Sequence, residues 1–286
     1  DDFTVIAAGD IGGNALTGEL MEYDLKEMDG SGVSGIVRFE ERMNENTLAT
    51  IEVNGTMDGV NHPAHIHENS VAEGGGVAIP FNNVDGATGI GQTNILSDES
   101  MSYSEIVNYD GHVNVHRSGD DFTVIAAGDI GGNALTGESM EYDLQEIDGS
   151  GVSGIVRFEE RVNENTLATI EVNGTMQGGS HPAHIHENSV AEGGGVVVPL
   201  NNVDGATGIS QTNILADETL TYSEALEYNG HVNVHKNTDD FTVIAAGDIG
   251  ANHSEDDSSG NSDGSNDGSN GGDDGGNDDD DNGGGY

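Results

Sequence analysis

Residues 35–55 read Gly-Ile-Val-Arg-Phe-Glu-Glu-Arg-Met-Asn-Glu-Asn-Thr-Leu-Ala-Thr-Ile-Glu-Val-Asn-Gly, and this stretch decides the fold class. It predicts two short strands, 35–41 and 47–53, rich in β-branched residues and bounded by the turn formers Asn and Gly. Helix is expected only near 103–108. Seven or eight such strands in each repeat favour an all-β chain built as a Greek-key β-sandwich. The other expected strands are 4–8, 19–25, 64–67, 76–80, 88–95 and 112–116.

The sequence is an internal repeat, because residues 1–119 align with 120–238 without a gap. The opening segment 1–12, Asp-Asp-Phe-Thr-Val-Ile-Ala-Ala-Gly-Asp-Ile-Gly, occurs again at 120–131 and a third time at 239–250. Two domain bodies therefore come with three copies of one apolar strand. One copy is left over.

The charge of the chain is strongly unbalanced, with 53 acidic residues against seven basic ones and a formal net charge of −46. Such a surface repels nucleic acid and anionic lipid head groups, so neither is expected as a partner. An acidic surface with few lysines is typical of proteins from high salt, where ions screen self-repulsion over about 3 Å at 1 M. We therefore expect a halophilic or marine source.

The residues that are missing exclude several kinds of site. Without cysteine the chain has no disulfide, no thiolate nucleophile, no iron–sulfur cluster and no blue-copper site. No apolar run approaches the roughly 20 residues that span a bilayer. The sequence begins at Asp1 and shows no signal segment, which we interpret as a processed, exported form. Sequons at Asn54, Asn173 and Asn252 are candidate glycosylation sites outside the cell.

Histidine carries the clearest chemical signal, because ten of the 11 histidines form two equivalent sets. On a strand, His65 and His67 point the same way, about 7 Å apart, and His112 and His116 do so on another strand. If the two strands are neighbours, their imidazoles converge on a metal ion. The candidate ligands are His62, His65, His67, His112 and His116 in the first repeat and His181, His184, His186, His231 and His235 in the second.

The identity of the metal follows from the donor atoms. An all-nitrogen site fits Cu(II) or Zn(II), and the affinity order puts copper first and zinc second. Glu68 and Glu187 follow the His-x-His motifs and are candidate outer acceptors that orient a ring. The competing interpretation is that the histidines are polar side chains bonded to turns, copied because the domain was duplicated.

The two histidine-bearing stretches resemble the CHRD domain, the family named from chordin. The resemblance is carried by His62-Pro63-Ala64-His65-Ile66-His67 with Gly74-Gly75-Gly76, and by Tyr109-Asp110-Gly111-His112-Val113-Asn114-Val115-His116. It implies a β-sandwich related to copper/zinc superoxide dismutase, found in secreted or surface-attached microbial proteins. It also makes 120–131 and 239–250 the closing strands. The implied organisation is an extra strand 1–12, domains 13–131 and 132–250, and an Asp/Gly/Ser/Asn-rich tail 251–286, expected to be flexible.

Three functions fit these features. The first is an extracellular or cell-surface structural protein that binds copper and polymerises head to tail, with Phe3, Val5, Ile6 and Ala7 donating a strand to a neighbouring copy. The second is a dismutase-like copper oxidoreductase, whose anionic substrate the net charge would repel. The third is a metal-sequestering or adhesive module, with weak Ca²⁺ binding by the acidic tail.

Overall fold

A computed structural model describes residues 8–253 of this chain. The prediction of an all-β fold is confirmed, since each repeat is built from antiparallel strands with one 3-10 turn and one short helix. The elements of the first repeat are η1 (Gly12–Asn14), β1 (Leu16–Glu27), β2 (Ser34–Arg42), β3 (Thr47–Asn54), β4 (Asn61–His62), β5 (Ala64–Glu68), β6 (Val77–Pro80), β7 (Val84–Asp85), β8 (Ile90–Ile95), α1 (Tyr103–Ile106), β9 (Gly111–His116) and β10 (Val124–Ile130).

The second repeat has the same order of elements, with two pairs of short strands merged into longer ones. Its elements are η2 (Gly131–Asn133), β11 (Leu135–Glu146), β12 (Ser153–Arg161), β13 (Thr166–Asn173), β14 (Ser180–Glu187), β15 (Val196–Asp204), β16 (Ile209–Ile214), α2 (Tyr222–Glu227), β17 (Asn229–Asn237) and β18 (Asp240–Gly250). The strands expected at 19–25, 35–41, 47–53 and 112–116 are all present within β1, β2, β3 and β9.

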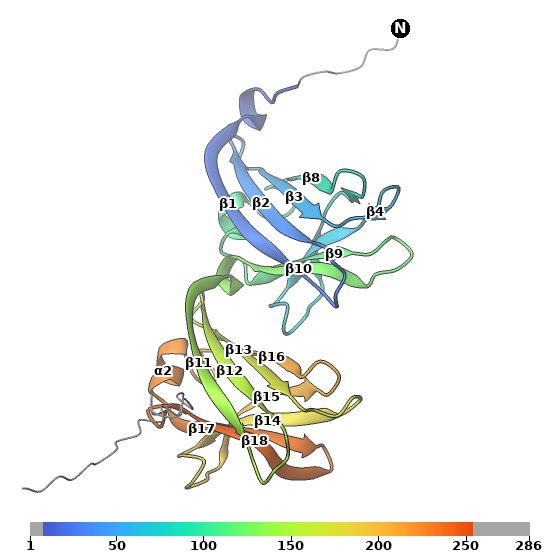
Figure 1. The fold of residues 1–286 in the computed structure, drawn as a ribbon. Helices are drawn as coiled ribbons and strands as arrows, with labels where there is room; N and C mark the ends of the chain where they lie inside the picture. The colour runs from blue at the N-terminus through green and yellow to red at the C-terminus, as the bar shows by residue number, and fades with distance from the viewer. Residues whose placement is uncertain (1–7, 254–286) are drawn as a thin grey trace, which may run out of the picture. The chain divides into compact units, whose positions relative to one another are not determined.

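A long first strand joins the two layers of each sandwich (Figure 1). Most of β1 pairs with β2, whereas its last residues Lys26 and Glu27 pair with Ala127 and Ala126 of β10. The strand order of the first repeat is β4-β7-β8-β3-β2-β1-β10-β9-β5-β6. The histidine strands β5 and β9 are therefore neighbours in the layer that β10 closes.

Each repeat has its own hydrophobic core, formed by residues that alternate along the strands. In β2, Val37 and Phe39 are buried while the side chains between and around them are more exposed. Ile66 of β5 is fully buried, so its neighbours His65 and His67 face the other side of the strand. Burial of each such apolar side chain contributes about 1.5–3 kcal/mol. The core thus fixes which way the histidines point.

The three copies of the repeated segment have different environments. Ile130 of β10 and Ile249 of β18 are fully buried, each closing the sandwich of the repeat that precedes it. Their counterpart Ile11 is 86% exposed. The proposed donor residues Phe3, Val5, Ile6 and Ala7 lie outside the described residues, as does the tail beyond His253. Between residues 8 and 253, the chain forms no helix long and apolar enough to cross a bilayer.

Candidate metal centre

The antiparallel register of β5 and β9 brings three histidines of the first repeat together. His65 lies opposite Asn114 and His67 opposite His112, and His116 ends β9 on the same side. The ring centres are 5.6 Å apart for His65 and His67, 5.1 Å for His65 and His116, and 6.2 Å for His67 and His116. One nitrogen from each ring lies within 4.8 Å of the other two.

The second repeat reproduces this group with His184, His186 and His235. Its ring centres are separated by 5.7, 5.1 and 6.2 Å, in the same order. We call the first group the first triad and the second group the second triad.

Hydrogen bonds to main-chain carbonyls set the tautomers of two ligands in each triad. His67 Nδ1 lies 3.1 Å from the carbonyl oxygen of Gly75, and His116 Nδ1 lies 2.8 Å from that of Phe122. A carbonyl only accepts, so in the neutral ring Nδ1 carries the proton and Nε2 holds a lone pair. Both Nε2 atoms are buried and have no hydrogen-bond partner among the described residues. Such unsatisfied buried acceptors are the atoms a metal ion would bind.

The third ligand uses its other nitrogen. His65 Nδ1 is the buried, unpartnered atom of that ring, and in the second triad His184 Nδ1 lies 3.1 Å from His235 Nε2. Because His235 Nδ1 already donates to the Phe241 carbonyl at 2.8 Å, its Nε2 can only accept in the neutral ring. The convergent nitrogens of each triad are thus two Nε2 atoms and one Nδ1 atom. In the second triad His184 Nδ1 donates to His235 Nε2, so its proton must move to the other nitrogen of the ring before Nδ1 can bind a metal.

Burial favours the neutral form of four of these imidazoles, His65, His116, His184 and His186, by lowering the pKa of each. Desolvation lowers the pKa of His65 below its ordinary value, and the neighbouring His116 and His67 rings lower it further. Desolvation is also the main cause that lowers the pKa of His116, against the bond to Phe122. The pKa values of His184 and His186 are lowered in the same way. A neutral ring is the form that coordinates a metal.

The structure separates the other four candidate histidines from the triads. His62 is buried, and its Nδ1 donates to the carbonyl of His116, 3.1 Å away, so this ring holds the strand that carries a ligand. His112 is also buried, donates from Nδ1 to the Asn69 carbonyl at 2.9 Å and stacks on His67 with 5.1 Å between ring centres. His181 and His231 occupy the equivalent places in the second repeat. Of the five candidate imidazoles in each repeat, three therefore form the close group.

The orienting acceptors also differ from the sequence-based expectation. No imidazole of residues 8–253 hydrogen-bonds to the carboxylate of Glu68 or Glu187, and the acceptors are the main-chain carbonyls of Gly75, Asn69 and Phe122. Gly75 approaches the chain so closely that a Cβ there would lie 2.2 Å from the Glu68 carbonyl oxygen. The run Gly74-Gly75-Gly76 was the signal that could have identified this loop.

The three sequons are not equivalent in the structure. Asn54 and Asn173 are exposed at the ends of β3 and β13. Asn252 is partly buried, and its Nδ2 lies 3.3 Å from the carbonyl oxygen of Gly230. The side chains of Asn54 and Asn173 are thus accessible for glycan attachment, whereas that of Asn252 is engaged in this contact.

The donor set fits a metal ion. Each triad offers three nitrogen ligands, and two of its rings are anchored through Nδ1 to main-chain carbonyls. Structural zinc is almost always bound by four protein ligands, whereas three ligands leave one position for water or another molecule. Copper or zinc is thus compatible with the site.

Comparisons with known proteins give little beyond this geometry. No family model matches the chain, and no curated protein matches it. Among solved structures it is similar to a point mutant of Candida albicans superoxide dismutase 5, with 16% sequence identity and a TM-score of 0.31. That match covers 41% of this chain and 93% of the dismutase. A likeness this weak carries no argument about function.

Proposed function

We propose that each repeat binds one copper ion through its triad, and that the protein is a structural, copper-binding component of the cell exterior. The observation that carries the metal proposal is the meeting of three imidazole nitrogens within 4.8 Å of one another in each repeat, all three of them buried and without a partner in the first triad. A bound ion would provide a partner for buried nitrogens, whose desolvation is otherwise uncompensated and lowers stability. Because the ligands come from β5 and β9, the ion would also tie two strands together.

Copper is preferred to zinc on the chemistry of the ligands. The site has nitrogen donors and no thiolate, and affinity for such donors rises toward Cu(II) in the divalent series. Three protein ligands also fall short of the closed four-ligand shell of structural zinc. When bound, the metal would supply Lewis acidity and, as copper, a redox couple.

The test of this proposal is a copper titration of the full chain. We expect two equivalents of Cu(II) to bind, and His116→Gln to remove one of them because it deletes a ligand of the first triad only. His253→Gln is the matched control, since His253 packs against Tyr142 away from both triads. Binding of two equivalents by the His116→Gln variant would contradict the proposal, as would binding of none by the unmodified chain.

Location outside the cell and assembly into head-to-tail filaments are part of the same proposal. The resemblance to the CHRD domain supports an exported protein, and exposed Asn54 and Asn173 are accessible for glycosylation. Support for assembly comes from Ile11, which is exposed although its equivalents Ile130 and Ile249 are buried in the sandwiches that they close. We propose that segment 1–11, with Phe3, Val5, Ile6 and Ala7, pairs with an open sheet edge of a second copy, because β10 and β18 already close both sandwiches of each copy.

Removal of residues 1–11 tests the assembly. Negative-stain electron microscopy of the full chain should show filaments that the truncated chain does not form. Both proteins should bind the same amount of copper, because the triads lie outside the removed segment. Filaments of the truncated chain would overturn strand donation.

A dismutase-like oxidoreductase is the alternative that the open coordination position favours. A net charge of −46 repels superoxide, so we expect copper-loaded protein to be no faster than free Cu(II) in an assay of superoxide decay. A rate well above that of free copper would favour the enzyme.

The third alternative is a metal-sequestering or adhesive module, in which the acidic tail, outside the described residues, binds Ca²⁺ weakly.

A further inference from the structure

We infer that Asp129 couples the second repeat to the metal triad of the first: Arg161 of the second repeat holds Asp129, and Asp129 holds the loop that orients the ligand His67. This inference rests on the proposed copper site. It is carried by a continuous series of contacts that the second triad has only in part.

The loop 69–76 contacts the first triad through two main-chain carbonyls. Its Gly75 carbonyl accepts from His67 Nδ1 at 3.1 Å, and its Asn69 carbonyl accepts from His112 Nδ1 at 2.9 Å. His112 in turn stacks on His67. A shift of this loop would therefore turn the His67 ring and move its Nε2 atom.

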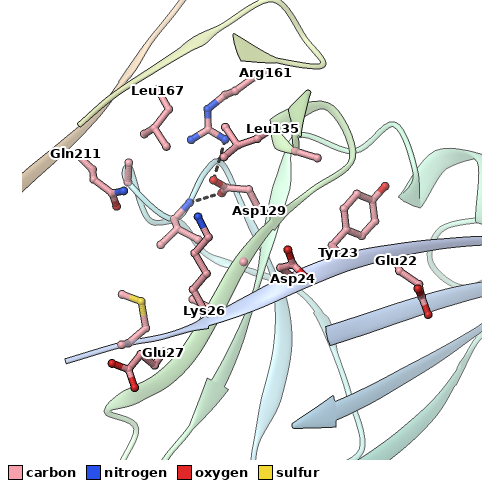
Figure 2. Close-up of a pocket in the computed structure, with 16 residues that line it drawn as sticks. Glu22, Tyr23, Asp24, Lys26, Glu27, Asp129, Leu135, Arg161, Leu167 and Gln211 are labelled. Carbon is pink, nitrogen blue, oxygen red and sulfur yellow. Dashed lines mark hydrogen bonds and ion pairs between the residues drawn. The ribbon is translucent and has the colours of Figure 1, made fainter. Parts of the chain in front are cut away.

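Asp129 of β10 fixes the loop from the other side. Its Oδ1 accepts the main-chain N–H of Val71 at 2.7 Å, and its Oδ2 accepts from Arg161 Nη1 at 2.8 Å (Figure 2). Asp129 also lies opposite His112 in the β9–β10 register. One carboxylate thus links the loop, the neighbouring strand and the following repeat.

Burial of Arg161 stabilises its ion pair with Asp129. Its side chain is 0% exposed, and it also donates to the Asn133 carbonyl. Asp129 is only 14% exposed, so the pair is largely shielded from water. A buried guanidinium without its carboxylate is strongly unfavourable. The carboxylate is consequently held in one orientation.

The second triad lacks the last contact of this series. Asp248 accepts the N–H of Val190 at 2.6 Å, and that loop carries the acceptors of His186 and His231 through Gly194 and Asn188. Within residues 8–253, however, no arginine or lysine pairs with Asp248. The counterpart of Arg161 in the first repeat, Arg42, pairs with Asp10, which is 51% exposed. The first triad should accordingly be the better ordered and the tighter site.

Single-site chains measure each triad separately. The first-site chain carries His186→Gln and His235→Gln, and the second-site chain carries His67→Gln and His116→Gln. Copper affinity is measured by titrating Cu(II) against glycine as competitor, and the ligand geometry by electron paramagnetic resonance. Altered outer contacts of metal ligands typically change affinity by about 10- to 100-fold.

We expect Arg161→Gln to weaken Cu(II) binding about tenfold in the first-site chain and to change its resonance spectrum, with no change in the second-site chain. Arg161→Lys should restore part of the loss. This result would distinguish positioning of His67 from general destabilisation of the protein. Arg161 lies in the second repeat, so destabilisation by its substitution should affect the second triad first. Arg42→Gln is the matched control, since it lies in the first repeat yet should leave the first triad unchanged.

A second pair of variants keeps the inference testable if Arg161→Gln folds poorly. Asp129→Asn should weaken only the first site, and Asp248→Asn only the second. Equal affinities for the first-site chain with and without Arg161→Gln, or a loss confined to the second site, would overturn the coupling alone. Failure of the unaltered first-site chain to bind Cu(II) would remove the copper proposal and the coupling with it.

Discussion

At the scale of single residues, the chemistry of the site depends on which nitrogen of each imidazole carries the proton. The carbonyls of Gly75 and Phe122 accept hydrogen bonds from Nδ1 of His67 and His116, which leaves the Nε2 lone pairs of these rings buried and unpartnered. His65 supplies Nδ1 instead. The main chain, rather than an acidic side chain, prepares the ligands.

The lowered pKa values predict how the metal-free protein responds to pH. The pKa values of His65, His112 and His116 lie below the ordinary 6.5, so the unfolded chain binds more protons than the folded one as pH falls past that value. Stability should be fully present above about pH 6.5 and decline as pH falls through the lower folded pKa values. Thermal unfolding of the metal-free protein between pH 7.5 and 5 measures this.

A double variant with His65→Gln and His116→Gln should show a shallower decline of its melting temperature, because two of the titrating rings are gone. His253→Gln should keep the slope of the unmodified chain. A melting temperature that rises on acidification from pH 7.5 would contradict this account of the buried rings.

At the scale of elements, the site exists because two histidine strands are neighbours and a glycine-bearing loop packs behind them. The pairing of β5 with β9 places His67 opposite His112, and the loop 69–76 approaches the end of β5 through Gly75. A side chain at residue 75 would collide with the Glu68 carbonyl. Loop position and ligand orientation are therefore linked.

Gly75→Ala should weaken copper binding at the first triad about 10- to 100-fold, because the loop must move and its carbonyl anchors His67. Gly76→Ala is the control, since its Cβ would meet only the flexible end of Glu68, at 3.4 Å. Competition titration of the first-site chain measures both. Equal losses for the two variants would mean that loop position does not determine the affinity.

The strands, and the face on which their histidines lie, could be predicted from the sequence. Alternation around Val37 and Phe39, with turns at Asn and Gly, gave the strands, and the period of two gave the shared face of His65 and His67. The ligand subset could not be predicted in this way, because His62 and His112 belong to the same motifs and differ only in tertiary hydrogen bonds. Likewise, the role of Asp129 depends on Val71 and Arg161, which are distant in sequence.

At the scale of the whole molecule, charge and repetition set the behaviour. A net charge of −46 on thin sandwiches opposes compaction by self-repulsion. The repetition also duplicates an ion pair: Asp10 and Arg42 stand at the positions equivalent to those of Asp129 and Arg161.

Salt should stabilise the protein substantially. Raising NaCl from 0.1 to 2 M shortens the screening length from about 10 Å to below about 3 Å, so repulsion among the carboxylates weakens. We expect the melting temperature of the metal-free full chain to rise across this range. A melting temperature that falls would indicate that attractive ion pairs such as that of Arg38 with Glu22 outweigh the repulsion.

The central claim is that three imidazoles of each repeat converge on a metal ion, and a crystal structure of the copper-loaded chain tests it most directly. Anomalous scattering at the copper edge should give one peak per repeat, bounded by His65 Nδ1, His67 Nε2 and His116 Nε2 in the first and by the equivalent atoms of His184, His186 and His235 in the second. Peaks located on surface carboxylates, with both triads empty, would contradict it.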